Sequence, residues 1–220
     1  MIHSVIMPTY NRLQFLQRAA MSVLKQHCVN PYDLELLIID DGSTDGTEEW
    51  VTNIDLEYKD HVRYIKLDHI GEPGIVRNHG LEASKGLFIS YLDSDDIWLP
   101  HHLATAMQAF GHNPRAFMVS NYWALAQWEP TPAEIIMHLV QHPHSKEVCN
   151  TNCRVHKREC LNAGLFNEKR WGEDADFFKR IEAKFKCIKT GIVTSINGYI
   201  KGGNNLTYEF DKGVKAKYYA

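Results

Sequence analysis

The chain has 220 residues, with 24 lysines and arginines against 27 aspartates and glutamates and with 44% hydrophobic residues. This composition is typical of a globular domain with a sizeable core, and it excludes an intrinsically disordered chain. The formal net charge of -3 provides no overall basic field for a phosphate backbone, so we expect no nucleic-acid partner.

Short apolar runs alternate with amphipathic stretches in the first half of the chain, which is the pattern of a parallel sheet covered by helices. The predicted strands are residues 4–7, 34–39, 62–67 and 87–92, the first of them ending at Pro8. Helices are predicted after the turn at residues 9–12 and over residues 74–84. Asp45 is expected to cap a further helix, with Glu48 three residues later as in a capping box.

The pattern is looser after Phe110 and indicates no second independent core. The elements predicted there are a strand at 116–123, a break at 129–132, a short helix at 133–141, a strand at 151–155, a helical turn at 157–163 and a helix at 173–185. The predicted fold class is therefore α/β in a single domain.

Acidic side chains follow two of the predicted buried strands. Asp40 and Asp41 end the second strand, while Asp93, Asp95 and Asp96 follow the fourth. The carboxyl ends of parallel strands line a common crevice, so we expect these acids to face one site. Like charges so close together raise each other's pKa, and a hard cation such as Mg²⁺ or Mn²⁺ would relieve the repulsion. The alternative is an acidic turn that caps the next helix.

Five strings carry a resemblance to a known family. They are residues 5–12 (VIMPTYNR), 38–45 (IIDDGSTD), 74–80 (GIVRNHG), 91–96 (YLDSDD) and 172–177 (GEDADF). Together they resemble the family 2 glycosyltransferases with the GT-A fold, and the resemblance runs from residue 4 to about residue 207. It implies a GT-A-like Rossmann-type sandwich, with a mostly parallel central sheet flanked by helices.

The resemblance also implies how the chain is organised and what it does. Residues 1–220 would form one catalytic domain, with a nucleotide-sugar-binding half at 1–97 and an acceptor-binding half at 98–220. The implied activity is inverting transfer of a sugar from a nucleoside diphosphate donor, UDP- or GDP-linked, to a hydroxyl of a glycan or lipid-linked carrier. The implied cofactor is a divalent metal ion, Mn²⁺ or Mg²⁺.

On the donor side, the resemblance implies that Asp40 reads the nucleobase and that Pro8, Tyr10 and Arg12 flank it. Asp93 would approach the ribose and stand beside the metal, and Asp95 would hold the metal.

On the reaction side, the resemblance implies that Asp174 is the general base, with Glu173 as its orienter or as an alternative base. A carboxylate is suited to taking the proton of an attacking hydroxyl. The alternative is that both acids only favour the amino end of a helix. Arg77 is a candidate to neutralise the leaving diphosphate, or else a helix-surface arginine, and Lys201 could pair with a phosphate oxygen or lie in a surface turn.

Two rival functions stay open. A sugar nucleotidyltransferase also uses a parallel sheet and acids around a metal, but it would need a glycine-rich basic loop where this chain has residues 8–12, PTYNR. A catalytically silent nucleotide-sugar-binding protein would lack either the metal acid or the base.

The five cysteines are an odd number, which favours reduced thiols. Cys149, Cys153, His156 and Cys160 are spaced closely enough for a structural zinc, but the strand expected at 151–155 favours buried thiols instead.

No apolar run approaches the roughly 20 residues of a membrane span, and the first residues carry no secretion signal. We therefore expect a cytoplasmic protein. Peripheral contact with the inner face of the membrane is possible through Lys212, Lys215 and Lys217.

Overall fold

A mixed sheet of nine strands runs through the part of the chain that the computed structural model describes, residues 3–27, 33–130, 135–140, 151–169 and 172–200. The order across the sheet is β3-β2-β1-β4-β8-β6-β9-β5, with β7 paired to β6. The strands are β1 (His3–Thr9), β2 (Leu34–Asp40), β3 (Val62–Lys66), β4 (Phe88–Tyr91), β5 (Ile97–Trp98), β6 (Met118–Pro130), β7 (Ile135–Val140), β8 (Arg154–Lys157) and β9 (Cys187–Ile200).

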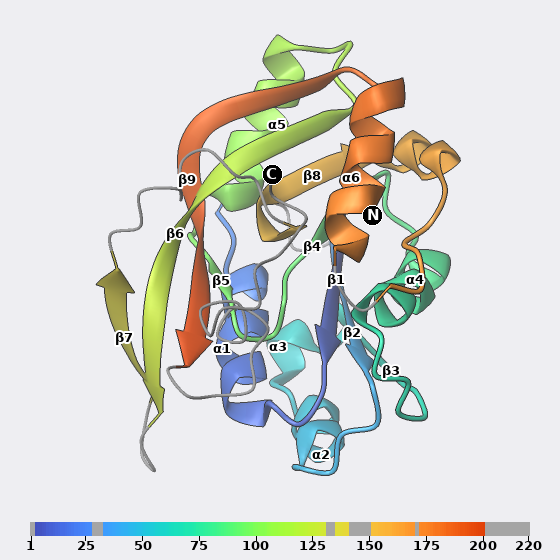
Figure 1. Ribbon diagram of the computed structural model, residues 1–220. Helices are drawn as coiled ribbons and strands as arrows, with labels where there is room; N and C mark the ends of the chain where they lie inside the picture. The colour runs from blue at the N-terminus through green and yellow to red at the C-terminus, as the bar shows by residue number, and fades with distance from the viewer. Residues whose placement is uncertain (1–2, 28–32, 131–134, 141–150, 170–171, 201–220) are drawn as a thin grey trace, which may run out of the picture.

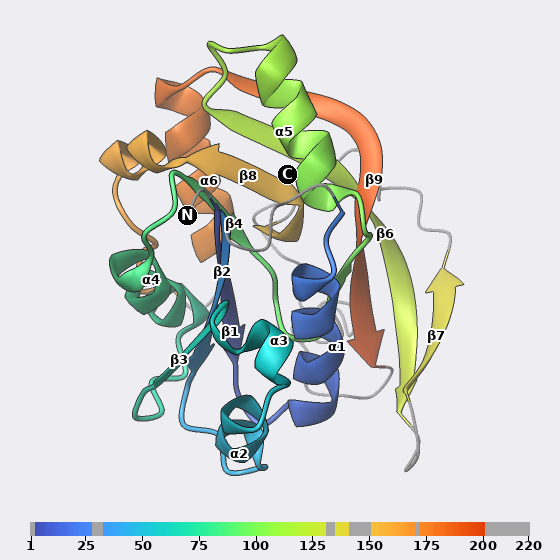
Figure 2. The ribbon, with the colours of Figure 1, turned by 180° about the vertical axis from the view of Figure 1, so that it is seen from behind.

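Helices cover both faces of this sheet (Figures 1 and 2). They are α1 (Leu13–Leu24), α2 (Thr47–Thr52), α3 (Leu56–Lys59), α4 (Pro73–Ala83), α5 (His102–His112), α6 (Glu173–Lys184) and the 3₁₀ helices η2 (Thr151–Cys153) and η3 (Arg158–Ala163). One core lies under α1 and α5, where Leu16 and Leu103 are fully buried. The other lies under α4 and α6, where Val76 and Phe177 are buried. The predicted α/β class is confirmed.

The first four strands form the parallel part of the sheet, as the sequence predicts. β1 pairs in parallel with β2 on one side and β4 on the other, and β3 adds to β2. Every residue of β2 is buried, because helices cover both faces of this part of the sheet. From β8 onward the pairing is mixed, since β8 is antiparallel to both β4 and β6, while β6 and β9 are parallel.

The first strand continues two residues beyond its predicted end. Pro8 pairs with Ile39 inside β1 rather than terminating it. The pairing with β4 reaches only as far as Ile6, so Pro8 lies where β1 has a single partner strand. The missing N–H of proline therefore costs no hydrogen bond to β4.

The predicted helix at residues 133–141 is wrong. Residues 135–140 form β7, which pairs antiparallel with β6, and β6 itself includes Glu129 and Pro130, the first two residues of the predicted break. The segment IIMHLV is short and rich in branched side chains, so its pattern does not distinguish a strand from a helix. Pairing with an available sheet edge decides in favour of the strand.

The predicted capping by Asp45 and Glu48 is also wrong in detail. Gly46, with φ of +93°, is the residue before α2 and has no side chain with which to cap the helix. Asp45 instead accepts from the amide and hydroxyl of Thr47 over 3.2 and 2.7 Å. Glu48 accepts from Lys66 Nζ over 2.6 Å, so its carboxylate is used across the sheet edge.

Gly80 of α4 allows the helix to pack closely on β1. A Cβ at this position would lie 2.5 Å from Ile6 Cγ2 and 3.2 Å from Ile39 Cγ1. Gly80→Ala is therefore expected to destabilise the protein by about 1–3 kcal/mol in urea unfolding, because a packed core resists added volume. Gly111→Ala is the matched control, since nothing lies within 4 Å of a Cβ there. It should leave stability unchanged or raise it by up to about 1 kcal/mol, and equal losses in both variants would contradict the prediction.

Three buried histidines should make the protein sensitive to acid. Burial lowers the pKa of His3 and His102 to about 3 and that of His156 to about 4. The unfolded chain takes up protons near pH 6.5 while these folded side chains stay neutral, so stability present above that pH is lost as the pH falls. Urea unfolding at pH 7.5, 6 and 5 should show a loss of about 2 kcal/mol per histidine by pH 5. A flat profile would contradict this, and His3→Gln should reduce the slope.

Candidate functional site

The turns that follow β1, β2 and β4 meet at the carboxyl edge of the parallel strands. Asn11, with φ of +48°, joins the first two turns. Its backbone amide donates to Ser43 Oγ and its side-chain Oδ1 accepts from the backbone amide of Thr44, both over 2.8 Å. Arg12 Nη1 reaches Asp95 Oδ2 of the third turn over 2.5 Å. Both acid clusters therefore lie at one edge of the sheet, and the expectation that they face a single site stays a prediction.

Asp40 is buried at the end of β2, next to an exposed aromatic pair. It accepts from the Ser43 amide over 2.9 Å and from the Tyr64 hydroxyl. Burial, followed by the Asp40 carboxylate, raises the pKa of that hydroxyl. Tyr10 is 42% exposed, and its ring stacks on His69 with centroids 4.1 Å apart and planes at 17°. This corner combines an exposed π-face with a buried carboxylate, while Pro8 is half-buried in β1.

Asp41 positions the histidine of that pair, a role that sequence reasoning missed. Its two carboxylate oxygens accept from the amides of Ile70 and Gly71 over 2.7 and 2.9 Å, and Oδ2 lies 3.0 Å from His69 Nδ1. The carboxylate therefore holds residues 69–71 under Tyr10. No sequence motif marks His69, because its role depends on this contact across the fold.

The three aspartates of the 93–96 loop have different partners. Asp93 Oδ1 accepts from Arg77 Nη2 over 2.7 Å, and Asp95 Oδ2 accepts from Arg12. Asp96 faces inward, where it accepts from the side-chain amides of Asn152 and Asn197 and from the Gly198 amide. The sequence groups these acids together, but the structure separates two arginine-paired carboxylates at the rim from one buried among amides.

Burial is the main cause of the raised pKa values in this loop. It raises the pKa of Asp95, with Arg12 opposing and Asp93 reinforcing the effect. It raises the pKa of Asp96 well above its ordinary value, with Asp95 and Asp93 adding to the shift. The repulsion between like charges expected from the sequence is present, but it comes second to desolvation.

Asp96 joins the acidic loop to the second half of the sheet. Asn152 in η2 also accepts from the Asp93 amide over 2.8 Å, and its carbonyl accepts from Trp98 Nε1 over 2.7 Å. The end of β9 is held against the loop by two hydrogen bonds to the Asp96 carboxylate. The side-chain amide of Asn197 donates over 2.9 Å and the backbone amide of Gly198 donates over 2.6 Å. Neither asparagine lies in a predicted motif, because only the fold brings these segments together.

Arg77 is buried, so the alternative of a helix-surface arginine is wrong. It is 5% exposed in α4, and it bridges two acids: Nη1 donates to Glu173 over 2.9 Å and Nη2 to Asp93 over 2.7 Å. Burial opposes the charge, but the two carboxylates outweigh it and raise the pKa of Arg77. This guanidinium therefore links the acidic loop to the start of α6.

Glu173 and Asp174 face different environments at the start of α6. Glu173 is 5% exposed and paired with Arg77, and burial raises its pKa while Arg77 opposes the shift. Asp174 is half-buried and accepts from Thr151 Oγ1 over 2.9 Å and from the Ala175 amide over 2.7 Å. Both acids lie in the first turn of the helix, but only Asp174 keeps access to solvent. Its role as the base stays a prediction.

The cysteine and histidine string is part of the core. Cys153 and Cys160 are buried thiols, as predicted. His156 Nε2 lies 3.0 Å from the Tyr91 hydroxyl and Nδ1 lies 2.9 Å from the Lys157 carbonyl, so both ring nitrogens have protein partners. Cys149, Lys201 and the lysines at 212, 215 and 217 lie outside the described residues.

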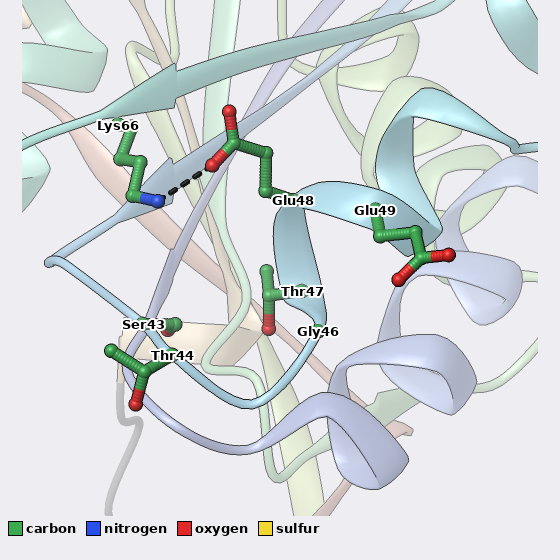
Figure 3. A pocket seen from close by; sticks show the side chains of 7 residues that line it. All are labelled: Ser43, Thr44, Gly46, Thr47, Glu48, Glu49 and Lys66. Carbon is green, nitrogen blue, oxygen red and sulfur yellow. Dashed lines mark hydrogen bonds and ion pairs between the residues drawn. The ribbon is translucent and has the colours of Figure 1, made fainter.

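A separate open pocket of about 350 Å³ lies beside the turn after β2. Figure 3 shows the side chains of Lys66 and Glu48, which both line this pocket, joined by a hydrogen bond. None of the residues to which a site role was assigned lines this pocket, whose walls are Ser43, Thr44, Gly46, Thr47, Glu48, Glu49 and Lys66. In the described part of the chain, no helix is long and apolar enough to cross a membrane.

The chain is similar in sequence to known glycosyltransferases. The family model "Glycosyl transferase family 2" matches residues 4–170. The chain is 36% identical over 120 residues to UDP-Glc:alpha-D-GlcNAc-diphosphoundecaprenol beta-1,3-glucosyltransferase WfgD of Escherichia coli. The aligned residues make up 54% of this chain and 45% of WfgD. The chain spans about a third to a half of the length of the curated relatives that it matches.

Two solved structures share the fold. S. aureus TarS in complex with UDP-GlcNAc superposes with a TM-score of 0.75 at 21% identity, over 92% of this chain and 60% of that one. The mannosyltransferase PcManGT from Pyrobaculum calidifontis, in complex with GDP-Man and Mn²⁺, gives 0.69 at 19% identity, over 89% and 56%. The predicted GT-A-like sandwich is thereby confirmed. Because the family model covers well over half of its length, this chain belongs to glycosyl transferase family 2.

Proposed function

We propose that this protein is an inverting, metal-dependent glycosyltransferase. It moves a sugar from a nucleoside diphosphate sugar to a hydroxyl of a glycan or lipid-linked acceptor. One observation carries the proposal: an exposed aromatic face, a loop of rim carboxylates and a solvent-accessible aspartate are joined through Arg12 and Arg77 at one edge of the sheet. A donor nucleotide, its diphosphate and an acceptor each need one of these features.

The nucleoside end of the donor is assigned to the corner of Asp40 and Tyr10. A planar base stacks favourably on an exposed aromatic ring, and Tyr10 offers one beside the half-buried Pro8. WfgD is named for a UDP-glucose donor and TarS was solved with UDP-GlcNAc, which supports a UDP-sugar. The ribose is assigned to Asp93, whose side chain is 32% exposed.

The donor set of the acidic loop suits a hard divalent cation. Asp93 and Asp95 offer carboxylate oxygens, the ligands that Mg²⁺ and Mn²⁺ prefer. Among the described residues, no group of three or more His, Cys, Asp or Glu side chains is arranged to hold a metal ion. That fits an ion that takes one or two carboxylates from the protein and its other ligands from phosphates and water. When bound, such an ion would neutralise charge on the leaving diphosphate.

Asp174 is proposed to take the proton of the acceptor hydroxyl. Its Oδ2 is oriented by Thr151 and its Oδ1 by the Ala175 amide, which fixes the carboxylate while leaving it accessible. As the hydroxyl oxygen forms its bond to the anomeric carbon, the bond to the diphosphate breaks on the opposite side, so the configuration is inverted. One carboxylate base is enough for this single displacement.

Glu173 is proposed to act through Arg77 and not as a base. Its carboxylate is committed to a buried ion pair over 2.9 Å, and a base must be able to reach the acceptor. Arg77 itself is committed to two carboxylates, which favours a positioning role over direct contact with the diphosphate. Lys201, beyond the described residues, stays a proposal for that contact.

The two rival functions have less support. A nucleotidyltransferase would need a glycine-rich basic loop after β1, and residues 8–12 contain no glycine. A catalytically silent binder would be expected to lack a base, but Asp174 provides an accessible carboxylate at the start of α6.

Residues 98–220 are proposed as the acceptor-facing half. A lipid-linked acceptor would bring the protein from the cytoplasm to the inner face of the membrane.

The test is a panel of UDP- and GDP-sugars assayed for thermal stabilisation and for transfer, with and without Mn²⁺ or Mg²⁺. A donor should raise the melting temperature in a metal-dependent manner, by mass action, and the product should have the opposite anomeric configuration. Formation of a sugar nucleotide from a sugar phosphate would favour the nucleotidyltransferase. Stabilisation without turnover on any acceptor would favour the silent binder.

A further inference from the structure

One of the proposed metal ligands, Asp95, already forms an ion pair with an arginine of the protein, Arg12. Arg12 Nη1 lies 2.5 Å from Asp95 Oδ2, and Asp95 is the residue to which metal binding is assigned. The Asp95 side chain is only 15% exposed and that of Arg12 is 33% exposed. The contact is a short charge-assisted hydrogen bond that solvent screens only in part.

We propose that Arg12 is the resident counter-ion of Asp95, and that a divalent cation enters this loop by displacing the Arg12 guanidinium. This inference rests on the proposed function, because it takes the metal site as given. An ion held by the Asp95 carboxylate would stand beside the Arg12 side chain, whose Nη1 lies 2.5 Å from Asp95 Oδ2. The two cations would repel one another, so the guanidinium has to leave when the metal arrives.

The fold explains why a counter-ion is needed here. Asp93, Asp95 and Asp96 lie within four residues of sequence, and the Asp95 side chain is only 15% exposed, so their like charges repel one another with little screening by solvent. Arg77 balances Asp93 and Arg12 balances Asp95. In the absence of a metal, the Arg12 contact therefore lowers the energy of an otherwise strained acidic loop.

The fold also explains why Arg12, and not Arg77, is the arginine that moves. Arg77 is held between two carboxylates and its side chain is 6% exposed, whereas Arg12 contacts one carboxylate of the loop and its side chain is 33% exposed. Arg12 is the residue before the first turn of α1, so its side chain can turn away without moving the helix. The released guanidinium is then available to the negative charge of a bound diphosphate.

Mn²⁺ binding to the full chain without nucleotide provides the test, because it needs no donor and no turnover. Free Mn²⁺ is measured by electron paramagnetic resonance and the binding heat by calorimetry. Arg12→Gln is expected to bind Mn²⁺ about tenfold more tightly than the unmodified protein, which corresponds to losing one competing ion pair. Asp95→Ala should abolish this binding in both backgrounds.

Lys66→Gln is the matched control. It removes the same single charge from the same edge of the sheet, but its ion pair is with Glu48 and not with the acidic loop. If overall charge alone attracts Mn²⁺, Lys66→Gln and Arg12→Gln will tighten binding equally, and the proposal is wrong. Unchanged affinity in Arg12→Gln, or no Mn²⁺ uptake by that variant at millimolar metal, also overturns it.

A second variant keeps the proposal testable if Arg12→Gln does not fold correctly. Arg12→Lys keeps the charge but loses the planar fork, so it should bind Mn²⁺ with an affinity between those of the unmodified protein and Arg12→Gln. An affinity of Arg12→Lys outside that interval counts against the proposal. The proposed function fails by a different result, which is the absence of donor binding and transfer in the unmodified protein whatever its affinity for Mn²⁺.

Discussion

Asp174→Asn is expected to reduce sugar transfer by about 10²- to 10⁴-fold, the range that a positioned general base contributes. Asparagine has nearly the same size: its carbonyl oxygen can still accept from the Ala175 amide, made over 2.7 Å to Oδ1, and its NH₂ group can donate to the Thr151 hydroxyl, which lies 2.9 Å from Oδ2. It cannot accept the proton of the acceptor hydroxyl. The loss should therefore fall on kcat, with donor affinity and melting temperature almost unchanged. Single-turnover transfer and donor titration by calorimetry measure the two quantities separately.

The control for this variant is Asp176→Asn, in the same first turn of α6. Asp176 pairs with Arg180 at i,i+4 over 2.9 Å and is 39% exposed, so it has a similar relation to the helix end without facing the other site residues. It should retain nearly full transfer. Equal turnover in Asp174→Asn and the unmodified protein would remove Asp174 from the reaction, and an equal loss in both aspartate variants would indicate an effect of charge at the helix terminus.

Arg77→Met is expected to give the largest loss of stability of any substitution in the site. It would leave Asp93 and Glu173 without the cation that lies 2.7 and 2.9 Å from them, and an uncompensated buried charge costs about 3–5 kcal/mol. The start of α6 would no longer be held to the acidic loop, so transfer should fall as well. Urea unfolding gives the free energy, and Lys66→Met, which breaks only an exposed pair with Glu48, should change it little.

A double substitution makes this prediction specific to the bridge. Glu173→Gln in the Arg77→Met background removes one of the two stranded charges, so it should recover part of the lost stability, whereas the same change in the unmodified protein should lower stability. Arg77→Lys should retain more stability than Arg77→Met, because one ammonium still faces the two acids. A loss in Arg77→Met no larger than in Lys66→Met would contradict the assignment of Arg77 as a structural link.

Most of the parallel half of the fold follows from the sequence. The strands ending in Thr9, Asp40 and Tyr91 are apolar runs followed by polar turns, and the helix at residues 73–83 has the expected place between two of them. These features are local, since a buried strand needs only a few consecutive apolar residues and a turn after them. Asp40 and Asp95 follow two of these strands and could be located in the same way, whereas Asp174 was indicated by the family resemblance and its role stays a prediction.

The second half of the sheet follows from the sequence only in part, since the strand predicted at residues 116–123 overlaps β6 (Met118–Pro130) but β7 and β9 were not predicted. β7 carries a pattern that suits either a helix or a strand, and β9 gives no clear signal although it pairs with β6 over most of its length. Pairing with β6, which is distant in sequence, is what determines both. Whether such segments become strands depends on their pairing partners more than on their own propensities.

The sequence by itself determined that this protein is an α/β domain with acidic loops at the carboxyl edge of its sheet, because those features depend on short stretches of residues. Only the tertiary structure decided how the acids are neutralised. Arg12 meets Asp95 across 83 residues of sequence and Arg77 meets Glu173 across 96. Local spacing does not encode which charges are paired and which stay accessible, since that depends on where the packed core brings distant segments together.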